Sequence, residues 1–163
     1  MTTPSSLLTT NYQLLTTDPM PLPEIINLQR KIKIDAEGFG VFAAEVRDVV
    51  GEFDGRRFSV AFVNDARMRQ LNELFRGRPQ TTDVLSFPNE PDEFDPEQDN
   101  LGDIVISAEQ ANRQAGDNGL SLEAEIKQLI LHGVLHLCGY DHETDNGEMD
   151  ARELELRQGL GLE

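Results

Sequence analysis

Two hydrophobic patterns run along the chain, and together they predict most of its elements. Runs rich in β-branched and aromatic residues are typical of strands, whereas apolar residues three and four positions apart are typical of helices. The predicted strands are residues 24–34, 57–63, 81–88 and 102–107. The predicted helices are residues 36–50, 65–75, 108–115, 122–138 and 148–158. Because strands and helices are interleaved, we expect an α+β (mixed α/β) domain with a small mixed sheet of about four strands flanked by helices.

Polar capping residues support three of these predicted helices. Asn64, Ser107 and Ser121 each stand directly before a predicted helix. Their side chains can accept a hydrogen bond from the backbone of the first turn, so we expect them to be the N-caps. Residues 89–100 contain six acidic residues and two prolines, which predicts a loop in solvent.

The length of 163 residues predicts a single domain, which we place at residues 24–163. Residues 1–23 are rich in Thr, Ser and Pro and contain no Lys or Arg, so they lack the basic region of a secretory signal and are expected to be a flexible tail. The single cysteine excludes an intramolecular disulfide and is typical of a reducing compartment, so we expect a cytoplasmic protein. No apolar run reaches about 18 residues, which predicts no membrane span.

The predicted helix at residues 122–138 is apolar nearly all round in its second half, which is typical of a helix in the middle of a fold. The three histidines of the chain lie at its end or just beyond it, at His132, His136 and His142. Histidines four apart project from the same helical face. A continued helix would carry His142 about 15 Å from His132, so the helix must end and the chain must turn back. Gly139 stands where a left-handed cap would allow this.

Three imidazoles gathered in this way predict a metal site, because three packing histidines at this spacing would be unusual. A structural zinc site would need a fourth protein ligand. Cys138 lies roughly 200° round the helix from His136, and Asp141 is better placed to orient a ring than to complete a tetrahedron. Three protein ligands with an open position are the pattern of a catalytic metal. We expect zinc, although nickel, cobalt or copper would also fit.

The chain is strongly acidic, with a net charge of −16 and a sequence pI near 4.4. This balance disfavours nucleic-acid binding through overall charge, so an RNA or DNA partner would have to be held by a local basic patch. In the segment 64–82, four arginines against two acidic residues give a net charge of +2. These arginines are Arg67, Arg69, Arg76 and Arg78. The segment is either a phosphate clamp or a solvated helix face, and the charge pattern alone favours neither.

The histidine spacing fits two known patterns. His-x-x-x-His-x-x-Gly-x-x-His is the zinc motif of metzincin proteases, in which a glutamate directly after the first histidine is the general base. Here that position is Gly133, which disfavours proteolysis. A glycine inside a helix costs about 1 kcal/mol relative to alanine, so we expect Gly133 to allow a close approach of another group beside the metal.

Over residues 24–160 the chain resembles the bacterial YbeY endoribonuclease family, and four blocks in the right order carry the resemblance. The family's His-Gly-x-Leu-His-Leu-x-Gly-Tyr-Asp-His stands at residues 132–142, and its Leu-Asn-x-x-Tyr/Phe-Arg-Gly at residues 71–77. Its Thr-Asp-Val-Leu-Ser-Phe-Pro stands at residues 82–88, and its Leu-Gly-Asp-Ile-Val-Ile at residues 101–106.

The resemblance implies a zinc-dependent endoribonuclease that acts in ribosomal RNA maturation and ribosome quality control. It implies one Zn²⁺ per chain on His132, His136 and His142, and a functional role for Arg76. Its partners would be single-stranded ribosomal RNA and the small ribosomal subunit with its associated factors, and neither DNA nor a membrane is expected. After Arg76-Gly77 the chain reads Arg-Pro-Gln-Thr, where Lys-Asp-Lys-Pro is common in the family.

We therefore predict metal-assisted hydrolysis of phosphodiester bonds in single-stranded RNA. His132, as a metal ligand, and Arg76, which would stabilise charge on the phosphate oxygens, are the predicted catalytic residues. Arg76, Asn72 and Ser86 are the predicted substrate-binding residues, with a packed hydroxyl as the alternative for Ser86. Asp141 is predicted to orient a ligand ring. The alternatives are a metzincin-like metalloprotease and a non-catalytic, ribosome-associated adaptor stabilised by zinc.

Overall fold

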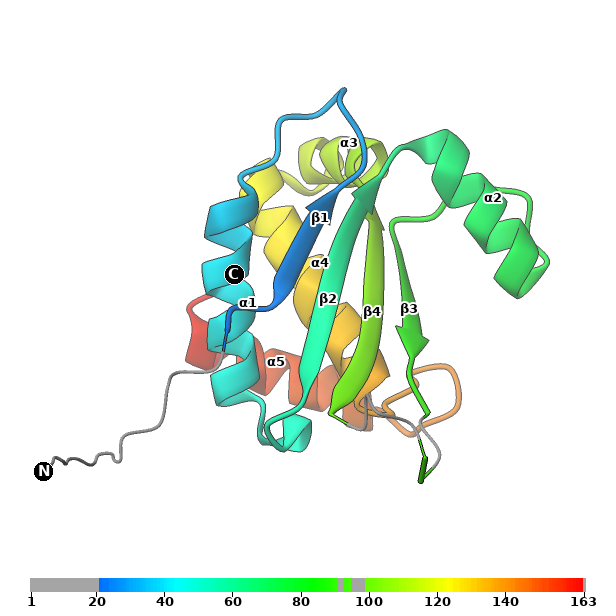
Figure 1. Cartoon of the computed structure of the whole chain (residues 1–163). Helices are drawn as coiled ribbons and strands as arrows, with labels where there is room; N and C mark the ends of the chain where they lie inside the picture. The colour runs from blue at the N-terminus through cyan, green and yellow to red at the C-terminus, as the bar shows by residue number, and fades with distance from the viewer. Residues whose placement is uncertain (1–20, 91–92, 95–98, 163) are drawn as a thin grey trace, which may run out of the picture.

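A four-stranded mixed sheet forms the centre of the fold (Figure 1). The computed structural model describes residues 21–90, 93–94 and 99–162. The strands are β1 (Glu24–Asn27), β2 (Arg57–Val63), β3 (Val84–Pro88) and β4 (Asn100–Ser107). They lie in the order β1-β2-β4-β3, where β1, β2 and β4 are parallel and β3 is antiparallel to β4. Since β3 ends this order, one of its sides has no neighbouring strand among the described residues.

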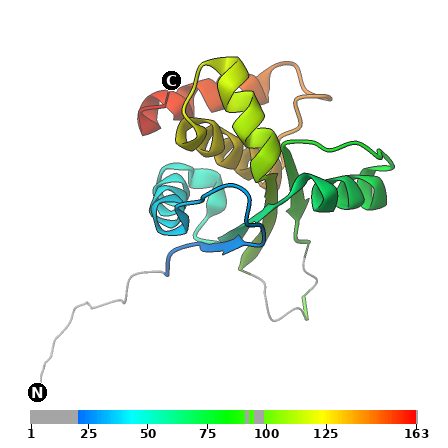
Figure 2. The same ribbon diagram turned by 90° about the horizontal axis from the view of Figure 1, so that it is seen from above.

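Helices cover the two faces of this sheet unequally. The helical elements in the described residues are α1 (Ala36–Val49), the 3-10 helix η1 (Gly51–Phe53), α2 (Asp65–Arg76), α3 (Ala108–Asn118), α4 (Leu122–Leu137) and α5 (Glu148–Leu160). Figure 2 shows α1, α3, α4 and α5 gathered on one side of the sheet, whereas α2 stands apart beside β3. The predicted mixed α/β architecture in a single domain is confirmed.

The predicted helix N-caps are also confirmed. The side chains of Asn64, Ser107 and Ser121 each accept a hydrogen bond from the backbone N–H three residues later. These bonds satisfy first-turn donors that a helix cannot pair internally. The starts of α2, α3 and α4 are therefore set by the local sequence.

The first predicted strand is wrong in its length, because β1 ends at Asn27 and the prediction extends it to residue 34. The cause is Gln29, which is only 6% exposed. Its amide nitrogen donates to the carbonyl oxygen of Ile32 at 2.7 Å, and its amide oxygen accepts from the N–H of Ile32 at 2.9 Å. These bonds close a turn and satisfy backbone groups that a longer strand would pair with a neighbour.

The helix α4 passes through the main hydrophobic core, as predicted. Its fully buried residues are Ile126, Ile130, Leu131, Val134 and Leu135. They belong to one cluster with buried side chains of α1, β2 and β4. Figure 1 shows α4 running diagonally behind the sheet. Side chains near its end are therefore held on a rigid support.

A second, smaller core lies on the opposite face of the sheet, under α2. It consists of Val63, Met68, Leu85 and Val105. The last turn of α2 extends beyond this cluster and is exposed to solvent. The first half of α2 is thus packed against the sheet, and its last turn is exposed to solvent.

The predicted close approach of another group at Gly133 occurs. A Cβ atom built at Gly133 would lie 2.9 Å from Cγ2 of Ile104, a fully buried residue of β4. The glycine therefore lets α4 pack tightly against the sheet.

Two predictions fall partly outside the described residues. Of the predicted flexible tail at residues 1–23, residues 1–20 lie outside the described residues. Of the predicted loop at residues 89–100, residues 91–92 and 95–98 lie outside them. Among the helices of the described residues, none combines the length and the apolar character that crossing a membrane would require.

Candidate metal centre

Two histidines face each other in the last turns of α4. His132 and His136 are half-buried, and their Nε2 atoms lie 3.2 Å apart. Their ring centroids are 4.8 Å apart, with the ring planes at 80°. The four-residue spacing places both rings on one face of the helix, as predicted.

The third histidine returns to this point because the chain reverses after α4. The helix ends at Leu137, and Gly139 has a φ of +100°, which only glycine adopts readily. The N–H of Tyr140 donates to the carbonyl oxygen of Leu135 at 3.0 Å and closes the turn. The ring centroid of His142 then lies 5.4 Å and 5.5 Å from those of the two α4 histidines.

The outer nitrogens of the two α4 histidines fix the orientation of the rings. Nδ1 of His132 lies 3.0 Å from Oε1 of Glu153 on α5, and Nδ1 of His136 lies 3.0 Å from the carbonyl oxygen of Tyr140. Both oxygens can only accept, so we assign the ring proton to Nδ1 in each case. With the proton on Nδ1, Nε2 of each ring faces the other ring.

The electrostatics of the site keep these roles fixed. Burial, together with the neighbouring His132 ring, lowers the pKa of His136, so this ring is neutral at neutral pH. Burial alone would raise the pKa of Glu153, but contacts with His132 and Arg157 outweigh it and hold this pKa below its ordinary value. Arg157 donates to the second carboxylate oxygen of Glu153 at 2.7 Å. Glu153 is therefore an anion held from two sides.

The histidine cluster has the donor set and spacing of a metal site. One ligand nitrogen from each of the three histidines lies within 4.8 Å of the others. Two nitrogens bound to a tetrahedral ion at about 2.0–2.1 Å would be about 3.3 Å apart. The observed separation of 3.2 Å between the Nε2 atoms of His132 and His136 agrees with this value.

Neither Cys138 nor Asp141 belongs to this cluster of possible ligands within the described residues. Burial and the nearby carboxylate of Glu52 raise the pKa of the Cys138 thiol to about 11. The two residues that the sequence offers as a fourth protein ligand therefore do not join the three histidines.

The carboxylate of Asp141 accepts a hydrogen bond from the backbone N–H of Glu143 at 3.0 Å and shapes the turn, and its predicted role in orienting a ring stays a prediction. The groups that contact Nδ1 of the two α4 histidines are Glu153 and the carbonyl of Tyr140. A sequence signal for Glu153 exists, because it lies four residues after the buried Met149 and three before the buried Leu156, on the inward stripe of α5.

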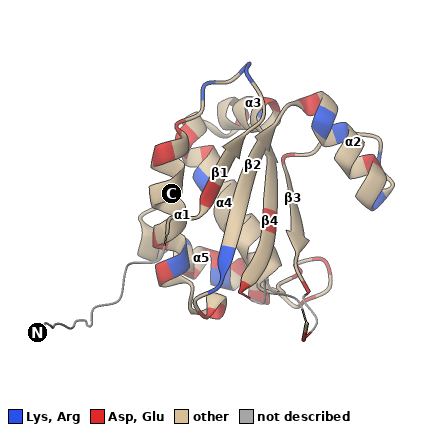
Figure 3. Cartoon of the chain, in the orientation of Figure 1, with Lys and Arg blue, Asp and Glu red and all other residues tan. Residues whose placement is uncertain are grey.

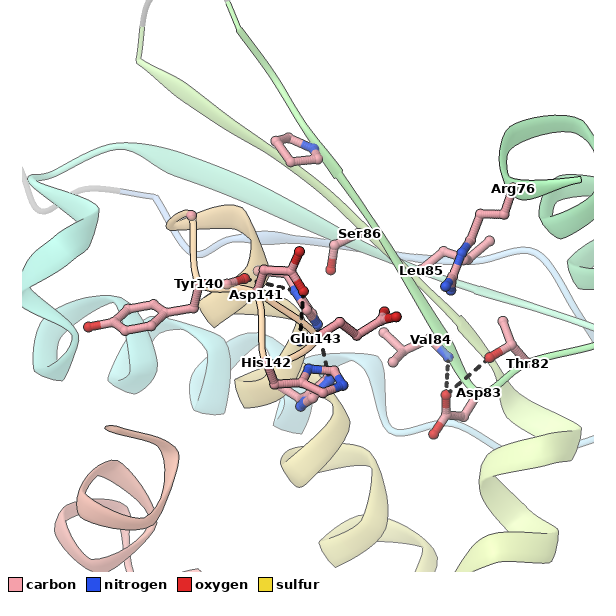
Figure 4. A pocket seen from close by; sticks show the side chains of 14 residues that line it. Arg76, Thr82, Asp83, Val84, Leu85, Ser86, Tyr140, Asp141, His142 and Glu143 are labelled. Atoms are coloured by element: carbon pink, nitrogen blue, oxygen red, sulfur yellow. Dashed lines mark hydrogen bonds between the residues drawn. The ribbon is translucent and has the colours of Figure 1, made fainter. Parts of the chain in front are cut away.

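A cleft of about 590 Å³ opens in front of the histidines. Its walls are the edge strand β3, the turn after α4 and the C-terminal end of α2. Figure 4 shows Arg76 on one side of the cleft and His142 on the other, with the side chain of Glu143 between them in this view and that of Ser86 above. The hydroxyl of Ser86 donates to the carbonyl oxygen of Gly133 at 3.1 Å, so it is at once a cleft residue and a packed hydroxyl.

Of the four arginines in segment 64–82, Arg76 is the one that lines this cleft. Arg67 is hydrogen-bonded to Gln70, and Arg69 lies at a separate hollow with Lys31 and Glu109. Most of the segment is therefore a solvated face, and its end contributes one guanidinium to the cleft.

The structure gives Asn72 a different place from the one the sequence predicts. Its side chain is 3% exposed and is not among the residues that line the cleft. Its amide nitrogen donates to the carbonyl oxygen of Gln80 at 2.8 Å. Asn72 thus fastens the segment that follows α2, and a direct contact with substrate would require it to be exposed.

Comparison with known proteins identifies the family. The profile described as Endoribonuclease YbeY matches residues 24–161. The chain belongs to the YbeY family.

Relatives and a solved structure support this assignment. Endoribonuclease YbeY of Moorella thermoacetica is 45% identical over 129 residues, which cover 74% of this chain and 81% of that protein. Endoribonuclease YbeY of Pelotomaculum thermopropionicum is 41% identical over 146 residues, which cover 85% and 96%. The solution structure of a Thermotoga maritima protein matches with a TM-score of 0.57 at 24% identity, covers 83% of this chain and 88% of that one, and shows the same fold.

The YbeY blocks that lie far apart in the sequence meet around the cleft. Residues 132–142 bring the histidines, residues 82–88 contain the edge strand, and residues 71–77 end at the arginine wall. The fourth block, residues 101–106, lies in β4, and its Ile104 packs against α4 at Gly133.

Proposed function

We propose that this chain is a metal-dependent endoribonuclease that hydrolyses single-stranded RNA in the cleft. The observation that carries the proposal is a set of three convergent histidine nitrogens opposite a guanidinium, in a member of the YbeY family. Relatives named as endoribonucleases support the same reaction class.

In this proposal His132, His136 and His142 hold the metal ion, and zinc is favoured because all three ligands are neutral nitrogens. When bound, such an ion supplies a water of lowered pKa and polarises a phosphoryl oxygen. Glu153 and the Tyr140 carbonyl contribute by keeping the two α4 rings in the tautomer that directs Nε2 inward.

Arg76 would bind the scissile phosphate from the opposite wall. Its guanidinium can donate two parallel hydrogen bonds to phosphate oxygens, and these strengthen as negative charge develops in the transition state. Ser86 lines the same cleft as Arg76 and the histidines and would set the depth to which the phosphate enters. Asn72 would act only as a positioning residue, since it ties the Gly77–Gln80 segment to the helix that carries Arg76.

The open cleft suits an unpaired strand, because a strand can follow β3 and α2 without the opening of a duplex. We extend the proposal to ribosomal RNA as the substrate, with the small ribosomal subunit and its factors as partners and the cytoplasm as the place of action. This extension depends on the family resemblance.

A metzincin-like protease is disfavoured by packing as well as by sequence. In those enzymes the residue after the first histidine must be a glutamate that reaches the metal-bound water. Here that position is Gly133, whose missing side chain would point into Ile104. A glutamate at this position would be driven into the core.

A non-catalytic adaptor stabilised by zinc makes a different prediction from an enzyme. The main core is built from apolar side chains of the sheet and four helices and includes none of the histidines. We therefore expect chelation to abolish cleavage and to leave the far-ultraviolet circular dichroism spectrum largely intact. Unfolding on chelation would favour the adaptor.

The deciding experiment is cleavage of an unstructured RNA oligonucleotide by protein purified under nuclease-free conditions. We expect His132→Ala and Arg76→Ala each to reduce the rate by about a hundredfold or more, because each removes a group that acts in the transition state. Arg67→Ala is the matched control, since it removes an arginine of the same helix outside the cleft. Undiminished cleavage by His132→Ala would show that a contaminating nuclease, not this site, is responsible.

A further inference from the structure

An exposed aromatic side chain stands next to the arginine wall of the cleft. Phe75 is 59% exposed although it continues the inward stripe of α2 that begins with the buried Met68 and the half-buried Leu71. It is exposed because the last turn of the helix extends past the edge of the sheet. A large apolar ring left in solvent beside a candidate site suggests a ligand contact.

The ring of Phe75 is held in place by a neighbouring aromatic ring. It packs against Phe87 of β3, with ring centroids 5.0 Å apart and ring planes at 69°. An edge-to-face contact of this kind leaves at least one ring face uncovered. Phe87 packs against the second core under α2, and neither ring is among the residues that line the cleft. The aromatic pair adjoins the cleft through Arg76, the next residue after Phe75 and a cleft residue.

The charge of the cleft shows why an apolar contact would be needed. Arg76 is the only Lys or Arg among the residues that line it, against three carboxylates, Asp83, Asp141 and Glu143. A divalent ion on the histidines would bring this balance only to neutral. Figure 3 shows that basic and acidic residues are interspersed along α2, in a chain whose net charge is −16. Electrostatic attraction alone is therefore a weak source of affinity for a polyanion.

We propose that Phe75 is a stacking platform for one nucleobase of the RNA strand whose phosphate is bound by Arg76. The inference rests on the proposed function and deepens it, because it assigns a base subsite to the same cleft. Stacking on an aromatic ring is tolerant of base identity and adds affinity that does not depend on salt. The adjacent positions of Phe75 and Arg76 at the end of α2 present a ring and a guanidinium to neighbouring parts of one nucleotide strand.

The test is the affinity for a fluorescein-labelled, fully 2′-O-methylated oligouridylate, checked by gel to stay intact. We expect Phe75→Ala to raise Kd by about tenfold, within the range of about 5- to 150-fold that the loss of one base stack produces. Phe75→Tyr should retain the affinity of the natural chain. Leu74→Ala is the matched control, because Leu74 is 74% exposed and is the preceding residue of the same helix.

A second oligonucleotide separates stacking from phosphate binding. A strand with the same phosphates but with abasic sites should bind the natural chain and Phe75→Ala with equal affinity. The chain contains no tryptophan, so Phe75→Trp adds a single reporter. Its fluorescence should be quenched by the oligouridylate and not by the abasic strand.

The outcomes distinguish the two levels of the proposal. If the natural chain neither binds nor cleaves RNA, the proposed function fails and the stacking subsite with it. If it binds and cleaves but Phe75→Ala matches Leu74→Ala, only the stacking subsite is overturned. A Phe75→Ala effect on self-association in sedimentation, without one on RNA affinity, would likewise overturn it in favour of a contact between protein chains.

Discussion

Two helices supply chemistry to the cleft, and they differ in burial and in support. α4 carries two of the histidines and contains five fully buried apolar residues in the main core. α2 carries Arg76, and its last turn lies in solvent beyond a small second core. The difference matches what each side chain has to do. Metal ligands need a fixed geometry, whereas a group that meets a long flexible substrate needs access.

This contrast has a consequence for mutations. Around α4, changes should disturb metal affinity and stability together, because the helix that carries two of the histidines also carries buried residues of the main core. At the end of α2, changes should affect binding or rate and leave stability nearly unchanged, because the side chains there have few buried contacts.

The largest effect expected from the support around α4 is that of Glu153→Gln. This substitution keeps the size of the side chain but removes the charge that holds Nδ1–H of His132 and that is paired with Arg157. Loss of such an outer partner commonly costs about 10–100-fold in metal affinity or activity. We expect a loss of this size in metal affinity, measured by competition with a chromogenic chelator.

The control for this prediction is Glu155→Gln on the same helix. Glu155 is exposed and pairs only with Arg152 among the described contacts. Equal metal affinity in the two variants would contradict the role assigned to Glu153 and would weaken the contrast between α4 and α2.

The next largest effect is expected for Gly133→Ala. Alanine favours a helix by about 1 kcal/mol over glycine, but its Cβ would lie 2.9 Å from Ile104, in a core that cannot easily give way. Overpacking of this kind typically costs about 1–3 kcal/mol, so we expect a net loss in the free energy of unfolding, measured by urea denaturation. In Gly116→Ala on α3 the added Cβ meets no atom within 4 Å, so this control should be neutral or slightly stabilising. Stabilisation by Gly133→Ala would mean that α4 is less tightly held than we argue.

The parts of the molecule that the sequence predicts well are those with local causes. The caps Asn64, Ser107 and Ser121 bond within their own helices, and the pair His132 and His136 follows from the helical repeat alone. The family blocks add the expectation that distant segments serve one site.

The parts that were missed depend on contacts between segments or on a competing local bond. The first strand was predicted too long because the side chain of Gln29 hydrogen-bonds the backbone of Ile32, which a longer strand would pair with a neighbouring strand. Asn72 resembles a substrate ligand by its position near Arg76, but its amide is used by the carbonyl of Gln80. Glu153 is separated from His132 by 21 residues, so only the packing of α5 on α4 brings them together.

The last effect, of similar size, concerns the turn that follows α4 and is expected for Glu52→Gln. Glu52 accepts hydrogen bonds from Arg152 on α5, at 2.9 and 2.8 Å, and from the hydroxyl of Tyr140, at 2.8 Å. The hydrogen bonds from Arg152, with a smaller contribution from Tyr140, outweigh burial and lower the pKa of Glu52 to about 2. Removing the charge should therefore reduce the free energy of unfolding at pH 7 by about 1–2 kcal/mol, once screening by solvent is allowed for.

The lowered pKa of Glu52 also predicts how its contribution to stability changes with pH. A carboxyl group whose pKa is lower in the folded state stabilises the fold fully above its unfolded pKa, and this contribution disappears as pH falls through the folded value. The difference between the natural chain and Glu52→Gln should thus be constant from pH 7 to about pH 5 and should shrink toward pH 2 in urea titrations. Glu45→Gln, on the exposed face of α1, should show no such trend. A Glu52→Gln difference that persists unchanged at pH 2 would mean that size and packing, not charge, hold the turn that returns His142 to the metal site.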